Sequence, residues 1–288
     1  MSTITLPDGR DLEVEVSGPA DGPVMLFHHG TPGASTQFGG MADEVHARGH
    51  RLVTWSRAGY GASSRRPGRS VADEVTDALA VLDHVGADAC VVAGWSGGGP
   101  HALACGALAP ERVRGVLSIA GVGPFGAPDL AFLEGMGQEN HDEFGAALEG
   151  DDRLRAYLDA QRPAILQITG DQIVDQMATL LPPVDRDLLT GDFGEFLARE
   201  FRQAVSVSID GWLDDDLAFT RPWGFDLDAI TVPTYVWQGS EDLMVPFAHG
   251  EWLAAHLPKA VVHLEAGEGH LSIGVGAMGR MLDELFAG

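Results

Sequence analysis

The stretch from Cys90 to Leu108 constrains the fold of this 288-residue chain more than any other. It begins with the apolar run Cys90–Ala93, which is typical of a strand buried on both faces. It ends in small and apolar residues, which predict a helix. Between them lies Gly94-Trp95-Ser96-Gly97-Gly98, a G-x-S-x-G pattern. At a strand-to-helix turn this pattern lifts the serine hydroxyl above the sheet edge, where the amides of the following helix also point.

Short apolar runs alternate with helical patterns along most of the chain. Further strands are expected at 3–6, 12–16, 24–27, 52–55, 113–120, 234–238 and 261–264. Helices are expected at 38–48, at 70–85 with Ser70 as N-cap, after Val245-Pro246 as far as Leu257, and finally up to Phe286. Strands that alternate with helices form a parallel sheet with helices on both faces, so the fold class is α/β.

A long middle segment has a different pattern. From about Pro128 to Trp223 the apolar residues fall at helical spacing, and no run predicts a strand. The preceding residues 121–126 match G-x-G-x-x-G, but Pro124 interrupts them and the next strand-like run is far away. A hinge between domains is therefore favoured over a dinucleotide site. The expected organisation is a core in two parts, residues 1–126 and 224–288, with a helical cap at 127–223.

The charge balance argues against two classes of partner. The chain has 42 acidic and 18 basic residues, a formal net charge of −24. Nucleic acids and anionic membranes require a basic face, so we expect neither as a partner. No apolar run approaches the length of a membrane span, and the N-terminus does not resemble a secretory signal. The expected location is the cytoplasm.

The sequence gives no sign of a metal or of a disulfide framework. Cys90 and Cys105 fall on the predicted strand and helix of the first stretch, where packed thiols are expected. There is no C-x-x-C or H-E-x-x-H, and the histidines lack zinc-ligand spacing. We therefore expect no metal and no cofactor.

Three polar residues follow the ends of predicted parallel strands: Ser96, Asp242 and His270. Ligands of open α/β sheets bind outside those ends. A serine needs a base to become nucleophilic, and His270 can take its proton while Asp242 fixes the imidazole tautomer. The backbone amides of Thr31 and Gly97 would face the oxyanion.

Other readings of single residues stay open. Asp242 alone could make a loop turn, and Asp129 is a rival acid after the 113–120 strand. His28 and His29 follow a strand, where histidines more often hold a loop than do chemistry.

The chain resembles the α/β-hydrolase superfamily over nearly its whole length. The resemblance rests on five segments in family order: HHGTPG at 28–33, RAGYGASS at 57–64, GWSGGG at 94–99, GSEDLMVP at 239–246 and GEGHLS at 267–272. It implies an eight-stranded, mostly parallel sheet with an inserted helical cap, and Ser96 as nucleophile, Asp242 as acid and His270 as base. By the same pattern Thr31 and Gly97 supply the oxyanion donors.

Two residues bear on the place of this chain within the superfamily. Members often carry aspartate before the arginine of the RAGYG turn, whereas this chain has Ser56. A serine at 96 argues against dehalogenases and epoxide hydrolases, whose nucleophile is aspartate.

The resulting expectation is a cytoplasmic, cofactor-free serine hydrolase that acts on a small, neutral, fairly apolar ester or lactone. A carbon–carbon bond hydrolase or a perhydrolase could use the same triad. A small-molecule receptor that keeps the fold and turns over slowly is the alternative from another class. The cap residues are expected to select the substrate, and the oligomeric state stays open.

Overall fold

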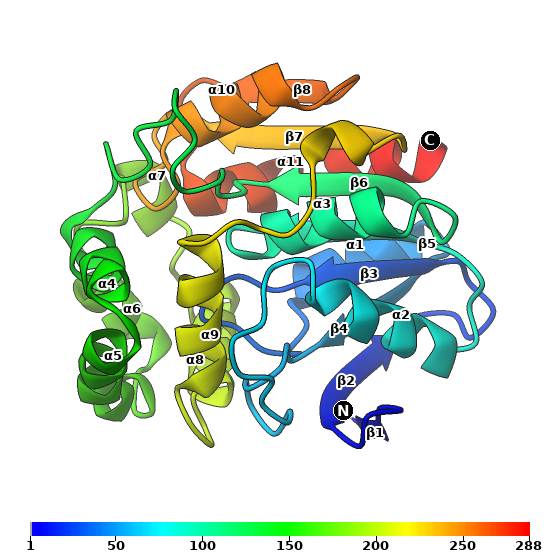
Figure 1. Ribbon diagram of the computed structural model, residues 1–288. Coiled ribbons are helices and arrows are strands. Elements are labelled where there is room, and N and C mark those ends of the chain that lie inside the picture. The colour runs from blue at the N-terminus through cyan, green and yellow to red at the C-terminus, as the bar shows by residue number, and fades with distance from the viewer. Residues whose placement is uncertain (1) are drawn as a thin grey trace.

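An eight-stranded sheet crosses the molecule in a computed structural model, which describes residues 2–288 (Figure 1). The strand order is β1-β2-β4-β3-β5-β6-β7-β8. β2 pairs antiparallel with both β1 and β4, and the remaining neighbours are parallel. The strands are β1 (Ser2–Thr5), β2 (Asp11–Ser17), β3 (Val24–His28), β4 (Arg51–Trp55), β5 (Cys90–Trp95), β6 (Val113–Ile119), β7 (Thr234–Gly239) and β8 (Val261–Glu265). Thus all eight expected strands are confirmed.

Helices cover both faces of the sheet. α1 (Gly39–Ala47) and α11 (His270–Ala287) lie together on one face. α2 (Glu74–His84), α3 (Gly98–Leu108) and α10 (Phe247–His256) lie on the other, with a short 3-10 turn, η1 (Leu227–Ala229), beside α3. Each face has its own apolar core, because the central strands are buried on both sides.

The segment between β6 and β7 contains helices and no strand among its described residues, as the sequence predicts. The inserted helices are α4 (Gln138–Glu149), α5 (Asp151–Ile165), α6 (Gly170–Gln176), α7 (Pro183–Arg186), α8 (Asp192–Ala204) and α9 (Asp210–Phe219). In Figure 1 they stack beyond the arrowheads of the parallel strands. They build apolar clusters of their own, in one of which Leu154, Leu158 and Leu213 pack with Tyr60 of the core.

One helix start differs from the sequence prediction. α2 begins at Glu74 rather than after Ser70, because the Asp73 carboxylate accepts bonds from the Ser70 amide and hydroxyl and holds these residues in a turn. His270 is the first residue of α11, the last helix. Within residues 2–288, no helix combines the length and apolarity needed to cross a bilayer.

Candidate active site

Ser96 sits in a sharp turn between β5 and α3. Its φ of 58° lies in the left-handed region, which is uncommon for a residue with a side chain. Its amide donates to the Ile119 carbonyl at 2.9 Å. A side chain at Gly98 would collide with the backbone of His28 and His29, so only glycine permits this close approach. The turn holds Ser96 in a strained, fixed position at the end of a central strand.

His270 and Asp242 are in direct contact. His270 Nδ1 lies 2.8 Å from Asp242 Oδ2, and both residues are 3% exposed. Asp242 Oδ1 accepts the amides of Met244 and Val245 at 2.8 Å each, and Gln238 donates to Oδ2 at 2.9 Å. These donors fix the carboxylate, so Nδ1 of His270 donates to it and Nε2 is left for a substrate or nucleophile.

The surroundings favour a protonatable His270. Burial by itself opposes the imidazolium, but the charge and hydrogen bond of Asp242, together with the charge of Asp185, outweigh it and raise the pKa of His270. A histidine base with a raised pKa accepts a proton readily near neutral pH.

Asp185 is a site residue that sequence analysis did not identify. It lies on the inserted helix α7, yet its carboxylate accepts the amides of His270, Leu271 and Ser272 at 2.8, 3.1 and 2.8 Å. These amides belong to the first turn of α11, where the backbone N–H groups have no carbonyl partner within the helix. Asp185 therefore anchors the histidine backbone from a segment 85 residues away in sequence. No sequence motif marks such a distant helix cap.

The turn at His29-Gly30-Thr31 lies against Ser96. A Cβ built on Gly30 would be 3.6 Å from the Ser96 Cβ. A Cβ on Gly97 would be 2.9 Å from the Thr31 Cβ, so these two segments touch. Arg57 fixes the turn by donating to the carbonyls of His29 at 2.6 Å and Gly30 at 3.0 Å. Thr31 and Gly97 thus lie side by side next to Ser96.

Arg57 takes its acid partner from the inserted segment. Asp215 on α9 is fully buried and lies 2.6 Å from both Arg57 and Arg69. It also accepts the hydroxyls of Tyr60 and Thr31 at 2.8 and 2.9 Å. Burial opposes its ionisation, but the two guanidinium groups hold the pKa of Asp215 well below its usual range.

Ser56, which stands before this arginine, has a separate role. It donates to Glu13 at 2.9 Å and accepts the amide of Ser35 at 3.0 Å. The arginine is therefore supported by Asp215 rather than by its chain neighbour.

Two other residues considered from the sequence, Asp129 and His29, do not contact His270. Asp129 accepts the Trp252 indole N–H at 2.7 Å on the surface and lies beside His256. His29 accepts the Arg57 amide at 3.1 Å and lies 2.7 Å from the Gly30 carbonyl, so it holds the turn. Burial lowers the pKa of His29 well below the usual value, which keeps the ring neutral. Within residues 2–288, no three His, Cys, Asp or Glu side chains are grouped to hold a metal ion.

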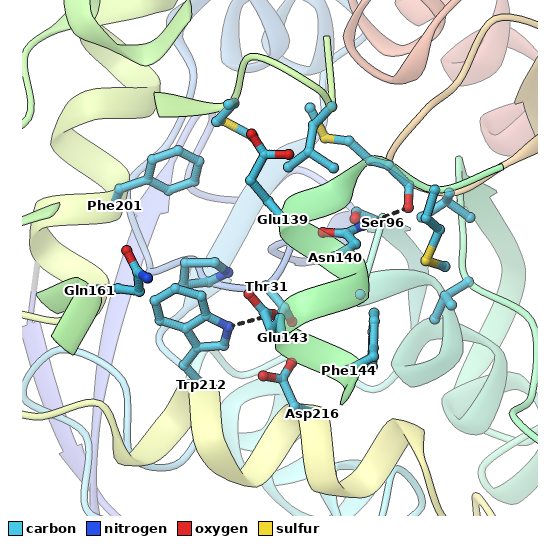
Figure 2. Close-up of a pocket in the computed structure, with 18 of the residues that line it drawn as sticks. Thr31, Ser96, Glu139, Asn140, Glu143, Phe144, Gln161, Phe201, Trp212 and Asp216 are labelled. Carbon is cyan, nitrogen blue, oxygen red and sulfur yellow. Dashed lines mark hydrogen bonds between the residues drawn. The ribbon is translucent and has the colours of Figure 1, made fainter. Parts of the chain in front are cut away.

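Two cavities reach Ser96. The first, about 190 Å³, runs from Thr31, Ser96 and Gly97 to the inserted helices α4, α5 and α9 (Figure 2), and we call it the acidic cavity. Its polar lining is Glu139, Asn140, Glu143, Tyr157, Gln161, Gln176, Trp212 and Asp216.

The second cavity, about 110 Å³, also contains His270 and is called the apolar cavity. It is lined chiefly by Phe27, Phe38, Met41, Phe193, Phe196, Leu197, Phe201 and Leu271. Ser96, Thr31 and Met244 line both cavities, so a substrate held at Ser96 can reach into either of them.

Comparison with known proteins gives relatives with the same fold. The chain is 25% identical over 259 residues to a non-heme chloroperoxidase of Streptomyces lividans, covering 89% of this chain and 88% of the relative. It is 29% identical over 145 residues to a bifunctional esterase/perhydrolase of Acinetobacter calcoaceticus, about half of each chain. A solved alpha/beta hydrolase fold protein from Nakamurella multipartita superposes with a TM-score of 0.67 at 25% identity, over 99% of this chain and 98% of that one.

The model of the alpha/beta hydrolase fold family matches residues 23–277. That match includes the Ser96 turn, the Asp242–His270 pair and all the inserted helices. The eight-stranded, mostly parallel sheet agrees with it, and the chain belongs to the alpha/beta hydrolase fold family.

Proposed function

We propose that this chain is a serine hydrolase that cleaves small esters or lactones through a covalent acyl-enzyme. One observation carries the proposal. Ser96, in a strained turn, lines the same cavity as His270, and Nδ1 of this buried histidine contacts the fixed carboxylate of Asp242. This is the set of parts that nucleophilic catalysis by serine requires.

Each residue has one role in the proposed reaction. Ser96 Oγ attacks the carbonyl carbon as His270 Nε2 takes its proton, and Asp242 stabilises the resulting imidazolium. The amides of Thr31 and Gly97 bind the oxyanion. His270 returns the proton to the leaving oxygen, and the same steps with water release the acid and restore Ser96.

The apolar cavity supports an ester with one hydrocarbon side. Its aromatic and aliphatic lining excludes water and can hold a short acyl or alkyl group next to Ser96. The inserted helices line both cavities, so they act as a cap that selects substrates. The small, neutral, fairly apolar substrate expected from the sequence fits this cavity but not the acidic one.

A perhydrolase is the second candidate, because one relative is named an esterase/perhydrolase. In that reaction hydrogen peroxide replaces water in attacking the acyl-enzyme, and the product is a peracid. Peracid formation from an ester in the presence of hydrogen peroxide tests this activity.

A panel of 4-nitrophenyl esters from acetate to octanoate, with five- and six-membered lactones, tests the proposal. We expect turnover of short and medium chains with a burst of nitrophenol, and no burst for Ser96→Ala. Turnover that is unchanged in Ser96→Ala would exclude the proposed mechanism. A wild type that cleaves no ester or lactone would favour a receptor or a carbon–carbon bond hydrolase.

A further inference from the structure

Asp216 is a buried carboxyl group whose hydrogen-bonding neighbour is another acid, Glu143. It lies on α9, is 1% exposed and lines the acidic cavity. No N–H group or hydroxyl among the described residues donates to either of its side-chain oxygens. In Figure 2 it rises from α9 toward Glu143 on α4, which accepts the Trp212 indole N–H at 2.9 Å. A buried carboxylate in this state is costly unless something else neutralises it.

No cation lines this cavity. Its described lining contains three acids, Glu139, Glu143 and Asp216, and no lysine, arginine or histidine. Arg69 acts on Asp216 from the core side, but its guanidinium contacts Asp215 at 2.6 Å. The neighbouring Asp215 charge adds to the negative potential. No basic side chain on the described wall of the cavity can therefore balance the charge of an ionised Glu143 or Asp216.

The two carboxyl groups hold a proton when the cavity is empty. Burial, the charges of Glu143 and Asp215 and the contact with Glu143 raise the pKa of Asp216 well above its usual range. Burial raises the pKa of Glu143 to about 7. The facing Tyr157 stays neutral, because burial and the nearby acids raise its pKa to about 12. A cation entering between the carboxyls would displace this proton.

Aromatic rings complete the cavity wall. Trp212, Tyr157, Phe144 and Phe201 line the same space. Ring faces attract ammonium groups, most strongly where water is excluded. The net charge of −24 also favours the approach of cations.

We propose that the acidic cavity binds a protonated amine of the substrate, placed between Glu143, Asp216 and the ring of Trp212. The preferred esters or thioesters then carry an ammonium group on one side of the cleaved bond and an apolar group on the other. This inference rests on the proposed hydrolase function, since Ser96 joins the two cavities.

Matched substrate pairs test the inference. 2-(Dimethylamino)ethyl thiobutyrate is compared with its carbon isostere, 3-methylbutyl thiobutyrate. The reverse orientation uses the 4-nitrophenyl esters of 5-(dimethylamino)pentanoate and 6-methylheptanoate. At pH 8 we expect kcat/KM to favour the amine by about tenfold in at least one pair. A ratio of one or less in both pairs would overturn the inference while leaving hydrolysis of the isosteres intact.

Neutral variants locate the effect. Asp216→Asn and Glu143→Gln keep the shape of each side chain and should bring the amine-to-isostere ratio within about twofold of one. Asp142→Asn is the matched control, because Asp142 is the exposed neighbour of Glu143 on α4 and lies outside the cavity lining. It should keep the wild-type ratio. A ratio that survives in Asp216→Asn, or that falls equally in Asp142→Asn, would contradict the inference.

The pH dependence gives a second readout. Glu143 loses its proton as pH rises through about 7, which leaves one negative charge on the pair, so the amine preference should increase between pH 6 and pH 8. A preference that is flat with pH, or that falls, would argue against the carboxyl pair as the binding group.

Binding separates this inference from the proposed function. Calorimetry on Ser96→Ala with the thioester pair measures affinity without turnover. We expect about tenfold tighter binding of the amine, and loss of that difference in Ser96→Ala/Asp216→Asn. If the wild type cleaves no ester, this measurement still decides the inference, and equal binding of the two thioesters would overturn it.

Discussion

Asp215 and Asp216 are adjacent on α9, both fully or almost fully buried, and have opposite environments. Asp215 faces the core, where Arg57 and Arg69 lie 2.6 Å away and two hydroxyls donate to it. Asp216 faces the acidic cavity, where no described N–H group or hydroxyl donates to it and its neighbour is the acid Glu143. Their pKa values accordingly move in opposite directions. A buried charge with a built-in partner supports the scaffold, whereas one without a partner marks a place for a ligand.

The same contrast separates the proposed catalytic residues from the cavity wall. Asp242 accepts three hydrogen bonds besides its contact with His270. Glu200 in the apolar cavity is buried, and burial raises its pKa to about 8, so it is mostly neutral. Changes on the core side should reduce turnover of every substrate or the stability of the fold, whereas changes in the cavities should alter selectivity.

The largest effect is expected at Ser96 and His270. Ser96→Ala and His270→Ala should each lower kcat by about 10⁴ to 10⁶ on amine and isostere substrates alike, because the triad acts as a unit. The double variant should be little worse than either single one. Steady-state kinetics on all three variants measure this. Additive losses would mean that the two residues do not cooperate. A loss confined to amine substrates would contradict the distinction between residues needed for all turnover and residues that set selectivity.

The second largest effect is expected for Asp242→Asn, which should lower kcat by a factor of about 10⁴. The amide cannot accept the Nδ1 proton with the strength of a carboxylate, so His270 adopts the wrong tautomer. Pre-steady-state kinetics should show slower acylation with substrate binding retained. Asp129→Asn is the control, since that carboxylate contacts Trp252 on the surface instead. A comparable loss in Asp129→Asn would exclude Asp242 as the sole acid.

The two aspartates of α9 should differ in stability. Asp215→Asn leaves two buried guanidinium groups without their carboxylate and should reduce the free energy of unfolding by about 3–5 kcal/mol. Asp216→Asn should change it by less than about 1 kcal/mol, since no cation loses its partner. Urea titration at pH 7 compares them. Equal losses would refute the difference between the two faces of α9.

The Asp215 contribution should also depend on pH. Its pKa is depressed in the folded state, so the stabilisation is present above the unfolded value of about 3.9 and is lost as pH falls. The wild type should therefore approach Asp215→Asn in stability only in acid.

The smallest effect is expected at Asp185. Its charge helps to raise the pKa of His270, so Asp185→Asn should lower that pKa. Because kcat/KM rises with pH as His270 loses its proton, this rise should move to lower pH in the variant. The turnover number should fall about tenfold or less, since an asparagine oxygen can still accept one amide of α11. A rise that stays in place would show that Asp185 supports the helix without tuning the histidine.

Much of this architecture follows from local patterns. The buried strands are short apolar runs, so their positions could be predicted, and Ser96, Asp242 and His270 each follow such a run. The boundary at Ser70 was wrong because Asp73 accepts its amide and favours a turn, a contact that residue spacing does not reveal.

The inserted helices could be predicted only as helices. Residues Asp214 to Asp216 have the composition of a solvated acidic run, yet all three are at most 2% exposed. The ion-pair partners of Asp214 and Asp215 are Arg65 and Arg57, which come from core loops distant in sequence. Glu143, the acid next to Asp216, comes from α4. Helix packing decides which of these residues meet, and it leaves no fixed spacing in the sequence. Asp185 was missed for the same reason.

Covalent labelling shows whether Ser96 is the nucleophile. The protein is treated with an activated alkyl phosphonate, digested and mapped by mass spectrometry. We expect one adduct, on Ser96, formed in step with loss of ester hydrolysis, absent in Ser96→Ala and much slower in His270→Ala. An active protein that is labelled at another residue, or that keeps its activity without any adduct, would contradict this role of Ser96.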